Sequence, residues 1–247
     1  TMEARLRVKL GDGVAGGSGD AALDEAHYEL VQTEDALKAW IAHADEAGAV
    51  AVDTETTNLD SMQAELVGVS LAVTAGRACY IPLGHKFADA STTGDLLHEG
   101  ESALAPEQLA MNCALDLLKP LLEDPAVLKI GQNIKYDKQV LVRYGIDITP
   151  VDDTMLISYV LEGGLHGHGM DELARDTLGV ETIKFKDVVG TGKSQITFDH
   201  VTLDKALNYA AEDADITLRL HKEFKPRLAR EHMVTVYETL ERPLIPV

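Results

Sequence analysis

The segment "AGAVAVDTETTNL", residues 47–59, begins as an apolar β-strand and then places two acids where a core strand should be most buried. Asp53 and Glu55 are two residues apart, so on a strand their side chains leave the same side of the sheet. A pair of this kind is also common as the solvated end of a strand. Its meaning therefore depends on what else in the chain reaches that face.

The pattern around this segment predicts an α/β domain with a mixed sheet, because strand-like runs come first and helical spacing follows. The expected strands are residues 28–30, 49–55, 65–73, 77–84 and 127–131. The expected helices are residues 33–47, 106–124, 132–145, 153–163, 170–179 and 202–229. A surface loop and a loop or lid are expected at residues 86–105 and 184–198.

Two of the expected helices carry polar pairs at their own period. Asn133 and Asp137 are four residues apart, as are Tyr209 and Asp213, so each pair shares one helical face. Each residue also has a purely structural interpretation, in which Asn133 caps its helix, Asp137 is an exposed acid and Tyr209 is a core residue with a backbone partner.

Convergence of these acids would give a metal site. Carboxylates that meet in a dry site repel one another and take up protons unless a cation compensates them. Oxygen ligands select Mg²⁺ or Mn²⁺ rather than zinc. Two such ions suit the in-line displacement of a phosphoryl group, so the pattern favours a metal-dependent phosphodiester chemistry.

Composition sets further limits. The chain has 247 residues and 45% hydrophobic content, enough for a sizeable core. Its formal charge of -19 argues against a nucleic-acid partner unless cations held by some of the acids reverse the local field. Cys79 and Cys113 have no spacing typical of a disulfide framework or a zinc site. The sequence has no run of 18 apolar residues, so we expect a cytoplasmic protein without a membrane partner.

Three segments carry a family resemblance. "VDTETTNLD" (52–60), "KIGQNIKYD" (129–137) and "YAAEDADITL" (209–218) are similar, in this order, to the three exonuclease motifs of the proofreading domain in the bacterial DNA polymerase I family. That domain belongs to the DEDD exonuclease superfamily, and Tyr209 corresponds to its tyrosine subclass. The resemblance extends to "TMLISYVLEGG", "HGMDELA" and "GKSQITF".

The resemblance also implies a domain organisation. It covers residues 28–225, which are expected to form the exonuclease domain, after a flexible linker or tail at residues 1–27. Residues 226–247 end in "TLERPLIPV", which resembles the junction to a polymerase domain that is absent from this chain. We expect a monomer that works with such a polymerase domain in cis, close to the bacterial nucleoid.

For the fold and chemistry, the resemblance implies a ribonuclease H-like five-stranded mixed sheet and 3′-to-5′ removal of nucleoside monophosphates from single-stranded or frayed DNA. Two divalent ions, Mg²⁺ or Mn²⁺, would be held by Asp53, Glu55, Asp137 and Asp213. Asp53 would bridge both ions, and Asp137 would reach one directly or through water. Tyr209 would orient the attacking water together with Glu55.

The resemblance assigns substrate contacts to five further residues: Leu59 as an apolar wedge against the terminal bases, Gln132, Asn133 and Tyr136 near the phosphate or sugar, and Phe185 over the single strand. Structural alternatives remain for two of them, with Leu59 as a core residue and Phe185 as a loop aromatic tucked onto the domain. Stacking would make such a site tolerant of sequence.

Two other functions share these residues. A ribonuclease D-like exonuclease would use the same acids and tyrosine to trim RNA, and a domain that had lost activity would serve only as a platform for the polymerase. The family often has an Arg close to the position of Gly167, and its absence here puts one phosphate contact in doubt. Three polar pairs receive structural interpretations: Asp152 and Asp153 as helix caps, Glu212 and Asp215 as solvated positions, and His166 and His168 as loop or packing residues.

Overall fold

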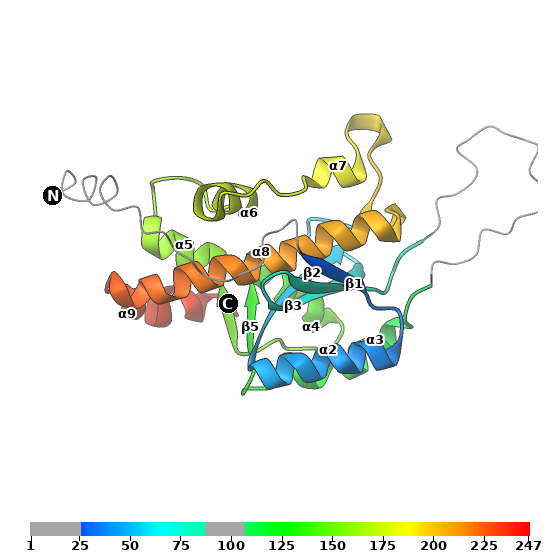
Figure 1. Ribbon diagram of the computed structural model, residues 1–247, viewed down its shortest axis with the longest axis horizontal. Helices are drawn as coiled ribbons and strands as arrows, with labels where there is room; N and C mark the ends of the chain where they lie inside the picture. Colours follow the sequence, from blue (N-terminus) through cyan, green and yellow to red (C-terminus); the bar gives the residue numbers. More distant parts are fainter. Residues whose placement is uncertain (1–25, 87–106) are drawn as a thin grey trace, which may run out of the picture.

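A computed structural model describes residues 26–86 and 107–247, and within these residues the chain forms a six-stranded mixed sheet with helices on both faces (Figure 1). The strands are β1 (His27–Leu30), β2 (Ala49–Thr56), β3 (Leu66–Thr74), β4 (Arg77–Pro82), β5 (Leu128–Gly131) and β6 (Val151–Asp153). The longer helices are α2 (Glu34–Ala47), α3 (Met111–Glu123), α4 (Lys135–Arg143), α5 (Thr154–Glu162) and α8 (Leu203–Arg230). The short helices are α6 (Met170–Leu173), α7 (Phe185–Val189) and α9 (Val234–Val236).

Strand β2 lies in the middle of the sheet, whose order is β1-β4-β3-β2-β5-β6. It pairs antiparallel with β3 and parallel with β5, while β1 and β6 lie parallel to their neighbours at the two edges. This arrangement confirms the mixed α/β architecture. The expected tail and the expected loop at 86–105 fall almost wholly outside the described residues.

The two faces of β2 point toward different helices. Val52 packs in a large apolar core with residues of α2, α3 and α4, whereas Ala51 packs against small side chains of α8. Because side chains alternate along a strand, Asp53 and Glu55 continue the α8 face of β2 and Thr54 continues the α4 face. Residues 53–55, near the end of β2, therefore contact elements on both faces of the sheet.

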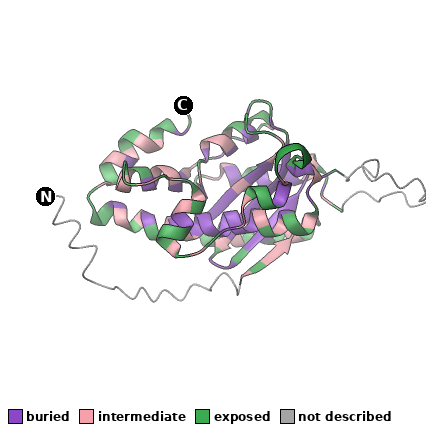
Figure 2. Cartoon of the chain, turned by 90° about the horizontal axis from the view of Figure 1, so that it is seen from above, coloured by how far each residue is buried: buried purple, intermediate pink, exposed green. Residues whose placement is uncertain are grey.

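Helix α8 lies directly on the sheet, with α5, α6 and α7 along its other side (Figure 1). Its contact with the sheet and nearby loops is made by small residues, which let the helix approach closely: Ala206, Ala210, Ala211 and Ala214. In Figure 2 the buried residues gather in the strands and the helix beside them, while exposed residues cover the outer helices. Of the helices in the described part of the chain, none has the length and apolar character needed to span a membrane.

The expectation that Glu212 and Asp215 are solvated is wrong. Glu212 accepts a hydrogen bond from the backbone amide of Ile183 at 2.7 Å. Asp215 is fully buried and accepts from the Gly76 amide at 2.9 Å and from Arg219 Nε at 3.0 Å. Helical spacing predicted exposure because Glu212 and Asp215 lie away from the face of Asp213, and only one face was assumed to be buried. In the structure α8 is covered by the sheet on one side and by other helices on another.

The sheet has a sixth strand that the sequence did not predict. Strand β6 is three residues long and holds Asp152 and Asp153, so it has no apolar alternation to mark it. Asp153 caps α5, as expected, by accepting from the amides of Met155 and Leu156. Asp152 does not cap a helix: it is fully buried and accepts from Tyr237 Oη at 3.1 Å.

Short helical elements also occupy the expected loop or lid at 184–198 and the segments around it. Helix α7 lies in the first part, followed by 3₁₀ turns at Gly192–Ser194 and Phe198–His200. Helix α6 continues into a π-helical turn at Ala174–Leu178, and α9 is followed by turns at Tyr237–Glu241 and Arg242–Leu244. Elements of three to five residues are too short to show a hydrophobic period.

We predict that Asp215→Ala lowers the free energy of unfolding by about 3–5 kcal/mol, because it leaves the buried Gly76 amide and the partly buried Arg219 without their carboxylate. Urea denaturation followed by circular dichroism measures this change. Glu223→Ala, on an exposed position of the same helix, should change the free energy by less than about 1 kcal/mol. Equal effects of the two substitutions would contradict a role for Asp215 in anchoring α8.

Candidate active site

A cavity of about 950 Å³ opens at the carboxyl end of β2. Its walls come from β2 and the loop after it, from the start of α4, from residues 185–198 and from α8. All ten residues proposed from the sequence line it: Asp53, Glu55, Leu59, Gln132, Asn133, Tyr136, Asp137, Phe185, Tyr209 and Asp213. Segments that lie far apart in the sequence therefore meet in one place.

Three of the acids form a compact group at the cavity floor. Asp53, Glu55 and Asp213 each offer a carboxylate oxygen, and these oxygens lie within 4.8 Å of one another. Oε1 of Glu55 is buried and has no hydrogen-bond partner among the described residues. A buried carboxylate oxygen without a donor, beside two other carboxylates, has the chemistry of a hard divalent cation site.

Asp137 approaches from the other layer and lies outside this group of three. It comes from the first turn of α4, on the opposite side of the sheet from α8, and it is buried. Its Oδ1 accepts hydrogen bonds from the backbone amide of Thr54 at 3.0 Å and from the Thr54 hydroxyl at 2.5 Å. Thus it is not an ordinary exposed acid, since its carboxylate is fixed at the edge of the cavity.

The acids perturb one another. Burial raises the pKa of Asp53, and the Asp213 carboxylate raises it further. Burial and the charge of Asp53 likewise raise the pKa of Glu55. Burial raises the pKa of Asp213 to about 8, even though a hydrogen bond from Tyr209 acts in the opposite direction. Without a cation the group therefore retains protons at neutral pH.

Tyr209 lies one helical turn before Asp213 and forms a hydrogen bond with it. Burial and the Asp213 carboxylate raise the pKa of the phenol, so its hydroxyl stays protonated and available as a donor. Its ring packs against Phe198 and Phe185 with centroid distances of 5.9 Å and 6.0 Å. The residue combines a packed ring with a hydroxyl directed at the acids.

The two apolar candidates for substrate contact differ in exposure. Leu59 is 93% exposed, so the interpretation of Leu59 as a core residue is wrong. Phe185 is 43% exposed and stacks in parallel on Phe198 at 6.4 Å. One face of the Phe185 ring is thus tucked onto the domain, while the residue still lines the cavity.

The polar candidates are held by hydrogen bonds of their own. The Gln132 amide donates to the backbone carbonyl of His168 at 2.8 Å and accepts from the Thr154 hydroxyl at 2.5 Å. The Tyr136 hydroxyl bonds Thr56 and the carbonyl of Asn58. These contacts orient both side chains along the cavity wall.

Asn133 does not cap α4. Its backbone has φ of 60°, in the left-handed region, and its backbone N–H donates to Asp153 Oδ1. Asp153 also accepts from the Ile134 amide at 3.0 Å, so the residue expected to cap α5 also holds the start of α4. Sequence spacing could not reveal this second role, because it depends on the neighbouring position of the two helices.

Nine lining residues were not proposed from the sequence: Thr54, Thr56, Thr57, Asn58, Met170, Gln195, Ile196, Thr197 and Phe198. The first four lie in "VDTETTNLD" and the last four in "GKSQITF", so the family resemblance marked these segments without assigning a role to these side chains. Among the described residues, the cavity lining includes no Lys, Arg or His. Four carboxylates therefore face the cavity without a basic side chain on its wall.

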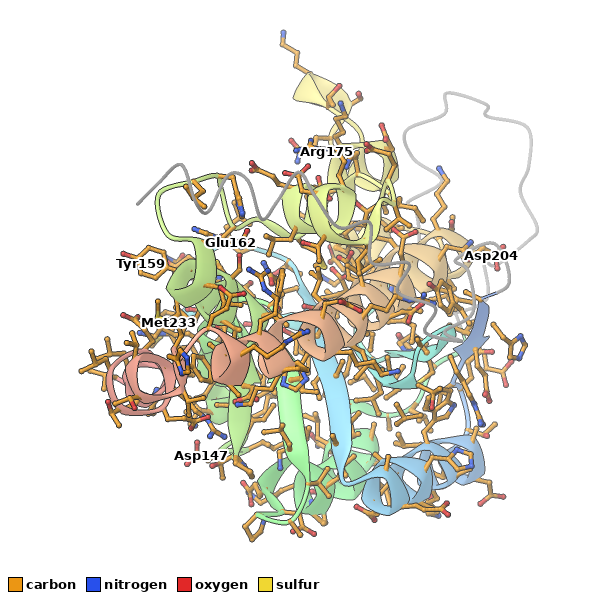
Figure 3. The ribbon with its side chains drawn as sticks, turned by 60° about the vertical axis from the view of Figure 1, so that its left-hand side comes forward. Asp147, Tyr159, Glu162, Arg175, Asp204 and Met233 are labelled. Carbon is orange, nitrogen blue, oxygen red and sulfur yellow. The ribbon has the colours of Figure 1, made fainter. Side chains whose placement is uncertain are left out.

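Gly167, close to the position where the resemblance led us to expect an Arg, lies against Glu172. The Gly167 amide donates to Glu172 Oε1 at 3.2 Å, and a Cβ atom at this glycine would meet Glu172 Oε2 at 2.4 Å. Nearby, His166 Nε2 contacts Glu162 Oε2 at 2.6 Å, and Glu162, labelled in Figure 3, also binds Arg227 at 2.7 Å. His166 is thus held by Glu162 of α5 and lies outside the cavity lining.

The fold is ribonuclease H-like, and acids line its cavity. Brucella melitensis NrnC with bound Mg²⁺ has a similar structure, with a TM-score of 0.59 and 22% identity over 90% of each chain. Escherichia coli RNase D has a TM-score of 0.61 and 17% identity over 90% of this chain and 51% of that chain. These likenesses establish the fold.

The sequence defines the family more narrowly. The family model described as 3′-5′ exonuclease matches residues 28–229. DNA polymerase I of Rhizobium leguminosarum is 52% identical over 233 residues, 91% of this chain and 22% of that protein. DNA polymerase I of Pseudomonas aeruginosa is 42% identical over 240 residues, 94% of this chain and 25% of that protein. The chain belongs to the 3′-5′ exonuclease family and represents the exonuclease domain of bacterial DNA polymerase I. It spans about a quarter or less of the length of these two relatives.

We predict that the metal-free protein loses stability as the pH rises. The pKa of Asp213 is raised from 3.8 to about 8, so the folded state holds a proton that the unfolded chain has released between these values. In EDTA the melting temperature should therefore fall by several degrees between about pH 5 and about pH 8. Differential scanning calorimetry measures the slope.

Asp213→Asn should reduce this slope, because one of the acids with a raised pKa no longer titrates. Asp204→Asn, at an exposed position labelled on α8 in Figure 3, should keep the slope of the unchanged protein. A slope that is the same in all three proteins would show that Asp213 does not retain a proton in the folded protein.

Proposed function

We propose that this domain removes nucleoside monophosphates one at a time from the 3′ end of single-stranded or frayed DNA, with two divalent cations, Mg²⁺ or Mn²⁺, held by the four acids. The observation that carries the proposal is the gathering of three carboxylate oxygens within 4.8 Å, one of them on a residue with an unpartnered buried atom. The Mg²⁺ in the NrnC structure of the same fold supports the choice of metal.

The four acids have distinct places in this proposal. Asp53, Glu55 and Asp213 would hold the first cation, and Asp53 and Asp137 would hold the second, Asp137 directly or through water. When bound, such a pair of cations lowers the pKa of the nucleophilic water and stabilises the charge on the phosphate and the departing 3′-oxygen. The acidic lining needs this compensation before it can accept a phosphodiester.

The chain's own residues would position the reactants. The protonated Tyr209 hydroxyl orients the attacking water together with Glu55, since both lie beside the Asp213 carboxylate. Leu59 projects into solvent at the cavity rim, where it can separate the last bases, and the half-exposed Phe185 offers a stacking surface. Gln132, Asn133 and Tyr136 line the wall opposite α8 and would contact the phosphate or sugar.

The proposed setting is proofreading by a DNA polymerase I. The relatives are whole polymerases of which this chain matches about a quarter or less, so a polymerase domain in cis is the expected partner, reached through residues 226–247. In this proposal the domain acts as a monomer in the cytoplasm, on DNA of the nucleoid.

The test is degradation of a 5′-labelled single-stranded oligonucleotide with Mg²⁺ or Mn²⁺, analysed on a denaturing gel. We expect a ladder of products shortened from the 3′ end, and Asp53→Ala should reduce the rate by at least about 10³-fold because the shared metal ligand is lost. Asp45→Ala, at an exposed position on α2, should leave the ladder unchanged. A ladder that persists in Asp53→Ala would contradict the metal assignment.

An RNA strand of the same sequence tests the substrate class under the same conditions. We expect slower trimming of RNA than of DNA. Faster trimming of RNA would favour the ribonuclease D-like alternative, and the absence of products from both strands would favour an inactive platform.

We predict that Tyr209→Phe lowers kcat by about 10- to 100-fold, because the water loses one of its two orienting groups while the packed ring remains. KM for the oligonucleotide and the affinity for Mn²⁺ should change little. Steady-state kinetics and isothermal titration calorimetry measure the three quantities. An unchanged kcat would exclude the phenol from the reaction.

A further inference from the structure

The end of β2 alternates between the two layers of the domain. Asp53 and Glu55 face α8 and join Asp213, while Thr54 lies between them and faces α4. Thr54 is 7% exposed and Asp137 is 3% exposed, so the contact between them is sheltered from bulk water. A single strand segment thus touches acids from both layers.

The contact between Thr54 and Asp137 has two parts. The backbone amide donates to Asp137 Oδ1 at 3.0 Å, and the hydroxyl donates to the same oxygen at 2.5 Å. Two donors on one oxygen fix the plane of the carboxylate as well as its distance from the strand. The β-branched Thr side chain is suited to this role, because few rotamers are open to it on a strand.

From this geometry we propose that Thr54 is a positioning residue for Asp137: it holds one carboxylate oxygen so that the other faces the second cation site. The inference rests on the proposed two-metal function. Asp137 lies outside the compact group of three acids, so its alignment depends on a link between α4 and the strand that carries Asp53 and Glu55. Thr54 supplies that link from within the acid motif itself.

Loss of such a hydrogen bond to a metal ligand commonly costs 10- to 100-fold in metal affinity or activity, because the ligand must be ordered when the metal binds. The cost should fall on one of the two cations. A cation at Asp53, Glu55 and Asp213 would take its ligands from β2 and α8 and would not depend on the Thr54 hydroxyl.

The test compares Thr54→Val with Thr54→Ser. Valine keeps the shape and the backbone amide but removes the hydroxyl, whereas serine keeps the hydroxyl. Mn²⁺ binding is followed by electron paramagnetic resonance and isothermal titration calorimetry, with a saturating deoxynucleoside monophosphate present as the proposed product. Thr182→Val is the matched control, because the Thr182 hydroxyl also donates to a carboxylate, Asp171, at 2.6 Å, but outside the group of acids.

We expect two Mn²⁺ ions on the unchanged protein. In Thr54→Val one of them should bind about 10- to 100-fold more weakly and the other with unchanged affinity. Thr54→Ser and Thr182→Val should bind both ions normally, and kcat should fall in Thr54→Val with little change in KM. Thr54→Ala provides the same comparison if the valine variant does not fold.

Two Mn²⁺ ions of unchanged affinity in the hydroxyl-free variants would overturn the inference. Equal weakening in Thr54→Val and Thr54→Ser would also overturn it, because packing rather than the hydroxyl would then be responsible. Fewer than two ions on the unchanged protein would instead contradict the two-metal function. The failure of the inference can thus be told apart from the failure of the function.

Discussion

Mutual repulsion among buried carboxylates is the constraint on which this structure depends. Asp53, Glu55 and Asp213 are brought together from β2 and α8, and burial and neighbouring charge raise the pKa of each. Such a group is costly for the metal-free fold and favourable only when a cation or protons neutralise it. The surrounding framework must therefore hold acids together that would otherwise separate, and it must do so from two layers.

The framework does this with further buried acids, each of which accepts hydrogen bonds from groups of other elements. Asp215 joins α8 to the turn before β4 through the Gly76 amide and Arg219. At the other edge, Asp153 receives backbone amides from the start of α4 and the start of α5, so the helix that carries Asp137 begins at a fixed point. Asp152 is bound by His221, Lys225, Arg242 and Tyr237, which ties the C-terminal segment to β6. Burial acts to raise the pKa of Asp152, but the hydrogen bonds and charges of His221 and Lys225 lower it to about 2. The acidic composition is therefore partly structural, and net charge alone gave little guidance about partners.

The spacing of residues along the sequence was enough to predict those features of the site that lie within a single strand or helix. The spacing of two in Asp53 and Glu55 and the spacing of four in Tyr209 and Asp213 each place side chains on one face, and the structure directs both pairs into the cavity. Features that depend on contacts between elements were not accessible in this way. Strand β6 is too short and too acidic to show a pattern, Asp215 lies on a helix covered from two sides, and the role of Thr54 becomes visible when α4 is in place beside β2. Leu59 shows the same limit, because a leucine after a strand does not reveal from its sequence whether it is buried or exposed.

The most direct measurement of the central claim is a crystal structure of the protein soaked with Mn²⁺ and a deoxynucleoside monophosphate, with anomalous difference density collected for manganese. The account predicts two anomalous peaks, one among Asp53, Glu55 and Asp213 and a second between Asp53 and Asp137. Peaks elsewhere in the molecule, or density that leaves Glu55 and Asp213 without a cation, would contradict it.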